Sequence, residues 1–132
     1  FSEAKLYDQL TSEYGSQFTP EAAQYAMENI DVDWNAEALE SAENYLEFAA
    51  FSKAKLYDQL TSEYGEKFTP EQAQYAVDTV NADWNAEAVE AAETYQDMMP
   101  MSGPALLEQL TSDYGQQFTM EEAQHAVSTL GL

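Results

Sequence analysis

Few side chains in this sequence could perform covalent chemistry. The chain has one histidine, His125, and it has neither cysteine nor arginine. His125 occupies a position that two earlier copies of an internal repeat fill with Tyr25 and Tyr75, which indicates variation at a packing or surface site rather than a general base. Catalytic carboxylate pairs need a cleft that raises the pKa of one member, and short repeated hairpins offer no obvious cleft. We therefore expect no enzyme, no catalytic residue and no cofactor.

The string DVDWN at 31–35 is the strongest candidate for a metal loop. It places oxygen ligands where a calcium loop has its first three, but the sixth position is Ala36 instead of glycine and the twelfth is Ala42 instead of glutamate. Asp33 and its counterpart Asp83 are better explained as helix caps. We therefore predict no metal site.

The charge of the chain narrows the classes of partner. Aspartate and glutamate number 25 against four lysines, which gives a net charge of -21. Proteins bind nucleic acids mainly through lysine and arginine at the phosphates, so we expect no nucleic-acid partner. The same field repels anionic membrane surfaces and attracts basic partners. Apolar residues make up 45% of the chain and aromatic residues 13%, and this composition favours a folded protein over a disordered one.

An internal repeat with a period of 50 residues organises the chain. FSEAKLYDQLTSEYG at 1–15 returns as FSKAKLYDQLTSEYG at 51–65 and as MSGPALLEQLTSDYG at 101–115. Residues 1–50 and 51–100 differ at 18 positions, and the third copy stops after 32 residues. The chain therefore contains two complete copies and a truncated third.

The first segment of each copy predicts a helix that begins after a serine and ends at a glycine. The predicted N-caps are Ser2, Ser52 and Ser102, and the predicted left-handed residues at the C-terminal end are Gly15, Gly65 and Gly115. Apolar residues spaced by four predict the buried face of this helix: Leu6, Leu10 and Tyr14, then Leu56, Leu60 and Tyr64, then Leu106, Leu110 and Tyr114.

Two further helices follow from the same kind of signal. A second helix is predicted to begin at Thr19-Pro20, at Thr69-Pro70 and at Thr119, with the phenylalanine before each threonine packing back onto the helix. Its apolar positions follow the i, i+3, i+4, i+7 pattern: Ala23, Ala26, Met27 and Ile30, with their counterparts in the other two copies. A third helix is predicted after Asp33 and after Asp83.

These segments predict an all-α protein of tandem helix-turn-helix repeats, forming small helical lobes joined by a helix in an elongated molecule. The joining helix would run through LEFAAFSKAK, which has no glycine or proline, whereas MMPMSGP at 98–104 must break or turn. The repeats can be divided as 1–50, 51–100 and 101–132. They can equally be divided as a hairpin at 1–32 followed by 33–82 and 83–132.

Three strings repeat together along the chain: LYDQLTSEYG, FTPEQAQ and DWNA, with small variations between copies. In this combination the sequence resembles the host cell surface-exposed lipoprotein (Ltp) family of Gram-positive bacteria and their temperate phages. The resemblance covers nearly the whole chain, and residues 33–132 look like two family repeats.

The resemblance implies a function. Members are lipoproteins anchored to the outer face of the cytoplasmic membrane, and those encoded by phages act in superinfection exclusion: a second phage adsorbs, but the injection of its DNA is blocked. A target attributed to them is the phage tape measure protein. For this chain we expect the same role as a monomer, with the lipid anchor on a missing N-terminal segment. The alternative is a passive cell-surface or cell-wall module without antiphage activity.

An acidic helical protein of this kind could bind a basic or amphipathic helical segment of a phage protein. The acidic positions that we expect to contribute are Glu13, Glu21, Glu63, Glu71, Asp113 and Glu121, and the expected aromatic anchors are Tyr25 and Tyr75. The simpler interpretation is that the charges are solvated surface and that the tyrosines belong to the core.

Overall fold

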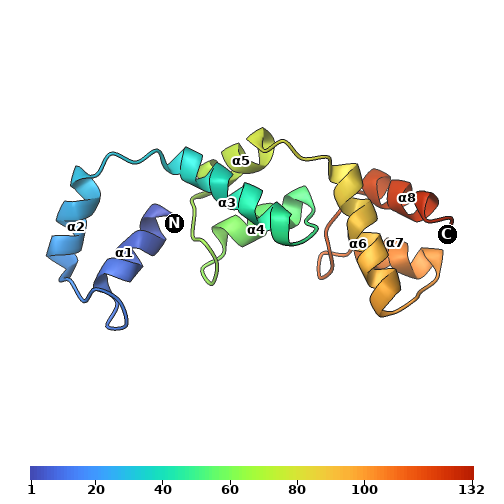
Figure 1. The fold of residues 1–132 in the computed structure, drawn as a ribbon, viewed down its shortest axis with the longest axis horizontal. Helices are drawn as coiled ribbons and strands as arrows, with labels where there is room; N and C mark the ends of the chain where they lie inside the picture. Colours follow the sequence, from blue (N-terminus) through green and yellow to red (C-terminus); the bar gives the residue numbers. More distant parts are fainter. The chain divides into compact units, whose positions relative to one another are not determined.

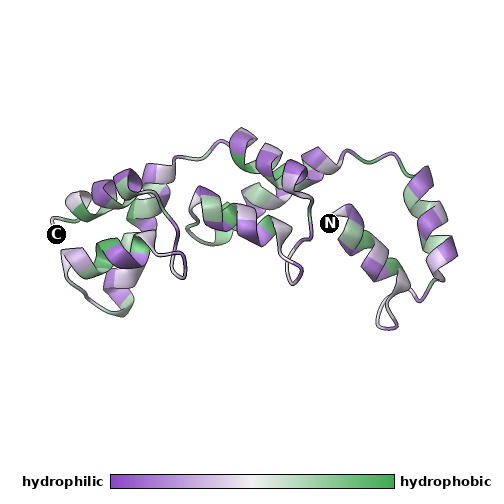
Figure 2. Ribbon diagram, turned by 180° about the vertical axis from the view of Figure 1, so that it is seen from behind, coloured by the Kyte–Doolittle hydropathy of each residue, from purple (hydrophilic) through white to green (hydrophobic).

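The computed structural model describes residues 1–132 and is entirely helical, which confirms the predicted fold class. It contains eight helices and no strand (Figure 1). Their bounds are α1 Glu3–Thr11, α2 Pro20–Asn29, α3 Trp34–Phe48, α4 Lys53–Thr61, α5 Pro70–Thr79, α6 Trp84–Met98, α7 Gly103–Thr111 and α8 Met120–Thr129. Figure 2 shows hydrophobic and hydrophilic residues alternating around these helices, as amphipathic helices require.

The helices begin where the capping residues predict. Ser2 Oγ accepts a hydrogen bond from the backbone N–H of Lys5 at 3.0 Å, and Ser52 Oγ does the same for Lys55. Thr119 and Glu122 form a complete capping box at the start of α8. These bonds satisfy N–H groups that have no partner inside the helix, so they select the first residue of each helix.

The predicted end of the first helix in each copy is wrong. α1, α4 and α7 end at the threonines 11, 61 and 111, four residues before the glycines. The glycines do not have positive φ angles; the left-handed residues are Gln17, Lys67 and Gln117, each with a φ of 59°. Glycine is needed for space instead, because a Cβ on Gly15 would lie 2.2 Å from the carbonyl oxygen of Gln9.

The buried face predicted for these helices is correct for the leucines and wrong for the tyrosines. Leu56, Leu60, Leu106 and Leu110 are fully buried. Tyr14, Tyr64 and Tyr114 lie beyond the helix ends and are 94%, 98% and 100% exposed. The spacing of four residues has no meaning there, since the backbone is no longer helical.

The predicted joining helix between copies one and two does not form. α3 ends at Phe48 and α4 begins at Lys53, because the buried Ser52 caps α4 and interrupts the helix. The predicted turn at 98–104 is confirmed. There Gln96 exchanges two hydrogen bonds of 2.9 Å with the backbone N–H and C=O of Met101 and holds the reversal of the chain.

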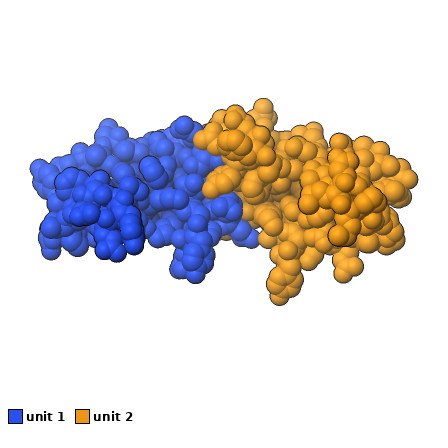
Figure 3. Space-filling model, turned by 60° about the horizontal axis from the view of Figure 1, so that its bottom comes forward, with its two compact units in different colours: residues 1–42, 58–79 blue, residues 43–57, 80–132 orange.

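The chain forms two compact units, coloured separately in Figure 3. Unit 1 comprises residues 1–42 and 58–79, and unit 2 comprises residues 43–57 and 80–132. In unit 2, α6 packs against α7 and α8. The core of this unit joins three alanines of α6 to leucines, a phenylalanine and two alanines of the α7–α8 hairpin: Ala88, Ala91, Ala92, Leu106, Leu110, Phe118, Ala123 and Ala126.

The same long-range contact recurs in both units. In unit 1, Lys5 Nζ donates a hydrogen bond of 3.2 Å to the carbonyl of Gly65. In unit 2, Lys55 Nζ donates one of 2.9 Å to the carbonyl of Gly115. Each lysine therefore holds the loop of the following copy. The corresponding residue of the last copy is Ala105, whose methyl side chain cannot donate a hydrogen bond.

Candidate protein-binding surface

A hydrogen-bonded turn follows each of α1, α4 and α7, and we call these turns the tips (residues 12–17, 62–67 and 112–117). Figure 1 shows them as projecting loops. In the first tip, Ser12 accepts two bonds: its Oγ binds the backbone N–H of Tyr14 at 3.1 Å, and its carbonyl binds that of Gly15 at 3.0 Å. The tip closes with the N–H of Phe18, which donates to the carbonyl of Leu10 at 2.8 Å. The same three bonds recur in the other two tips, so the backbone is well constrained.

Each tip presents an acidic residue beside an almost fully exposed tyrosine. Glu13, Glu63 and Asp113 are all exposed and directly precede Tyr14, Tyr64 and Tyr114. The acidic residues were predicted from the sequence as partner contacts, but these three tyrosines were not, because their spacing from the leucines suggested the buried face of a helix. The serine two residues earlier was the available signal, since a serine side chain that bonds the backbone two residues on is typical of a turn.

The second set of predicted residues lies on the second helix of each hairpin. Glu21, Glu71 and Glu121 are exposed in the first turns of α2, α5 and α8. Tyr25 is 70% exposed and Tyr75 is 42% exposed, so neither is a core residue. All eight predicted positions are therefore accessible to a partner.

The structure brings only some of the predicted residues together. Glu21 and Tyr25 line one shallow groove of the first hairpin, with Tyr7 and Glu28 beside them. Glu13 does not line this groove and belongs to the tip. In unit 2, the exposed His125 lines a groove with carboxylates of α6. No pattern in the sequence predicted that groove.

Glu87 has a perturbed environment. Its Oε1 accepts a hydrogen bond of 3.1 Å from the backbone N–H of Phe51. Burial raises the pKa of Glu87 above its ordinary value of 4.5, the hydrogen bond from Phe51 opposes that rise, and the charges of Glu90 and Asp83 add to it. The carboxylate thus ties residues 43–57 to α6 within unit 2, and we assign it a structural role.

We expect Glu87→Gln to gain stability relative to the parent chain as the pH rises above 4.5. A raised pKa means that the folded chain binds more protons than the unfolded chain, so this glutamate's contribution is present below the unfolded pKa and is lost as the pH rises through the folded pKa. Glutamine keeps an oxygen for Phe51 and removes the titration. Urea unfolding at a series of pH values measures the difference, with Glu40→Gln on an exposed helix position as the control. A difference in stability between the parent and Glu87→Gln that does not vary with pH would contradict the raised pKa of Glu87.

None of the eight helices has both the length and the apolar composition that a membrane crossing requires.

A comparison with protein families identifies the family of this chain. The family model described as "Host cell surface-exposed lipoprotein" (Ltp) matches residues 1–30, 33–80 and 83–130. The chain belongs to this lipoprotein family. The model thus matches three successive segments, which follow the internal repeat.

A solved structure of an Ltp protein is also similar. It is that of Ltp, a superinfection exclusion protein from the Streptococcus thermophilus temperate phage TP-J34. The two chains are 35% identical, and the superposition has a TM-score of 0.65 and covers 74% of this chain and 97% of the other. A search of curated proteins gives no match.

Proposed function

We propose that this protein acts in superinfection exclusion: at the outer face of the cytoplasmic membrane of a Gram-positive host, it binds the tape measure protein of an incoming phage and blocks the injection of DNA. The likeness to the phage TP-J34 protein supports the role. The family description supports a place at the host cell surface, where a lipid anchor would hold the protein.

The three tips are the observation that carries the binding proposal. Each combines an exposed aromatic side chain with a carboxylate on a hydrogen-bonded backbone. Tyrosine is a frequent hot-spot residue because it buries a large area at a small cost in conformational entropy. With a net charge of -21, the chain attracts a basic segment from a distance, and the tyrosines provide short-range contact.

Calorimetric titration of the folded chain with fragments of tape measure protein, at two salt concentrations, tests this proposal. We expect binding that weakens at the higher salt concentration, because screening reduces attraction between exposed charges. Charge reversal at the acidic members of the predicted set should abolish it: Glu13, Glu21, Glu63, Glu71, Asp113 and Glu121. Unchanged binding by that variant would refute the electrostatic part.

A passive surface module is the second candidate, because the family description names the cell surface and no antiphage activity. Such a module would bind cell-wall polymer and ignore phage proteins. Adding purified wall polymer to the same titration separates the two candidates. Binding to the polymer alone would replace the first proposal with the second.

A further inference from the structure

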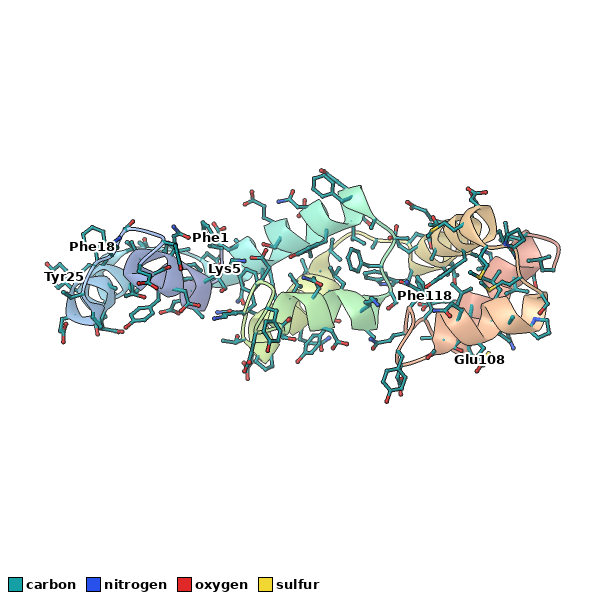
Figure 4. All side chains as sticks on the ribbon, turned by 90° about the horizontal axis from the view of Figure 1, so that it is seen from below. Phe1, Lys5, Phe18, Tyr25, Glu108 and Phe118 are labelled. Atoms are coloured by element: carbon teal, nitrogen blue, oxygen red, sulfur yellow. The ribbon has the colours of Figure 1, made fainter.

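Two lysines hold tips that belong to the following copy of the repeat. Lys5, labelled in Figure 4, lies near the start of α1, and its Nζ donates to the carbonyl oxygen of Gly65 in the second tip. Lys55, at the equivalent position of α4, donates to the carbonyl oxygen of Gly115 in the third tip. Each bond joins residues 60 positions apart and is partly shielded from water, so it belongs to the tertiary structure rather than to the local turn.

The third tip is also held from α6. The hydroxyl oxygen of Tyr95 accepts hydrogen bonds from Gln109 Nε2 at 3.2 Å and from Gln116 Nε2 at 2.9 Å. Gln116 belongs to the tip, and its backbone N–H donates to the carbonyl oxygen of Gln109 at 3.3 Å. Lys55 and Tyr95 therefore bind the third tip from two different segments of unit 2.

The start of α4 gives Lys55 a fixed position. The buried Ser52 accepts a hydrogen bond from the backbone N–H of Lys55 at 3.0 Å. The preceding residue, Phe51, donates its backbone N–H to the carboxylate of Glu87 on α6. The lysine side chain thus extends to the tip from a backbone that is itself bonded to α6.

The need to reduce the net charge does not explain where these lysines lie. The chain has four lysines against 25 acidic residues, so a lysine anywhere on the surface would have that effect. Lys5 and Lys55 are instead half-buried, and each donates to a backbone carbonyl. A loop already held in its binding conformation loses less conformational entropy on association, which raises affinity. Both lysines can therefore affect binding from outside the contact surface.

We propose that Lys5 and Lys55 are positioning residues for the second and third tips, and that Tyr95 acts together with Lys55. They hold each tip in the conformation that presents its exposed tyrosine and carboxylate to a partner. The inference rests on the proposed function and deepens it, because it assigns the preorganisation of a tip to side chains of the preceding copy. Lys5→Met and Lys55→Met both keep an apolar stem, remove the donor and change the net charge equally. Each variant is therefore the control for the other.

Amide hydrogen exchange of the full chain, followed by NMR, tests this assignment without a partner. The backbone N–H groups of Gly65 and Gly115 make equivalent bonds of 3.0 Å inside their tips. We expect Lys55→Met to accelerate exchange at Gly115 at least about tenfold and to leave Gly65 unchanged. Lys5→Met should do the reverse. Tyr95→Phe should act as Lys55→Met does, and the amides of α6, which report global unfolding, should change little in every variant.

Affinity for tape measure fragments separates positioning from charge. The double variant of Lys5→Met and Lys55→Met is more acidic than the parent, so a purely electrostatic role of the lysines would make a basic fragment bind more tightly. We expect calorimetry to show binding at least about threefold weaker, because the partner must then order the tips.

Two outcomes would overturn the inference. Equal acceleration at Gly65, at Gly115 and in α6 would show that the lysines only stabilise the whole fold. Unchanged or tighter binding by the double variant would show that the tips need no positioning. If the parent chain binds no fragment, the proposed function fails, whereas the exchange measurement still supports or overturns the assignment of the lysines.

Discussion

Leu110→Ala is expected to destabilise the protein by about 2–5 kcal/mol, because it removes a fully buried side chain and leaves a cavity. Leu110 lies in the core of unit 2, among residues from α6, α7 and α8. At the equivalent position of the first hairpin, Leu10 is only half-buried. Leu10→Ala should therefore cost clearly less, although the two leucines occupy the same position of the repeat.

Urea unfolding followed by circular dichroism measures both variants. The matched pair isolates the tertiary environment, because the same side chain is truncated at the same position of the same repeat. Leu60→Ala, at a fully buried position of the middle copy, should behave like Leu110→Ala. Equal losses for Leu10→Ala and Leu110→Ala would show that Leu10 is as well packed in solution as Leu110.

Replacing Tyr14, Tyr64 and Tyr114 together by serine should reduce affinity for tape measure fragments by at least about tenfold. The three side chains are 94% to 100% exposed, so their removal deletes contact area for a partner without leaving a cavity. The serine-based hydrogen bonds of each tip involve the tyrosine's backbone and are kept. The melting temperature should therefore change little.

Calorimetry with the fragments used for the parent chain measures the loss. A second variant, with Tyr25 and Tyr75 replaced by serine, tests the anchors predicted from sequence against those found in the structure. The salt dependence of binding should survive in both variants, because neither removes a charge. Undiminished affinity of the tip variant would exclude the tyrosines as anchors.

The capped starts of the helices were predicted correctly because a cap involves only a few neighbouring residues. Ser2, Thr119 and Asp83 each accept a hydrogen bond from a backbone N–H three residues on, so both partners lie within one short stretch of sequence. The starts of the helices and the buried leucines of the later copies followed from these signals and from the spacing of apolar residues.

The end of the first helix was predicted wrongly because the same residues are compatible with a longer helix and with a turn. Tyr14 continues the spacing of Leu6 and Leu10, and Gly15 resembles a helix end, so both suggested a longer helix. The chain instead leaves the helix at Thr11, and the side chain of Ser12 organises a turn. Glycine is required there by the nearby carbonyl of Gln9, a contact that no spacing rule contains.

The sequence by itself determined the helical class, the period of 50 residues, the capped helix starts and the acidic character of the protein, because composition and short-range hydrogen bonding decide these. Only the tertiary structure decided which equivalent residues are buried. Phe18 and Phe118 follow almost the same sequence, yet one is half exposed and the other is buried with the alanines of α6. Burial depends on which helix packs against each hairpin, and that is a property of the assembled fold rather than of the repeat.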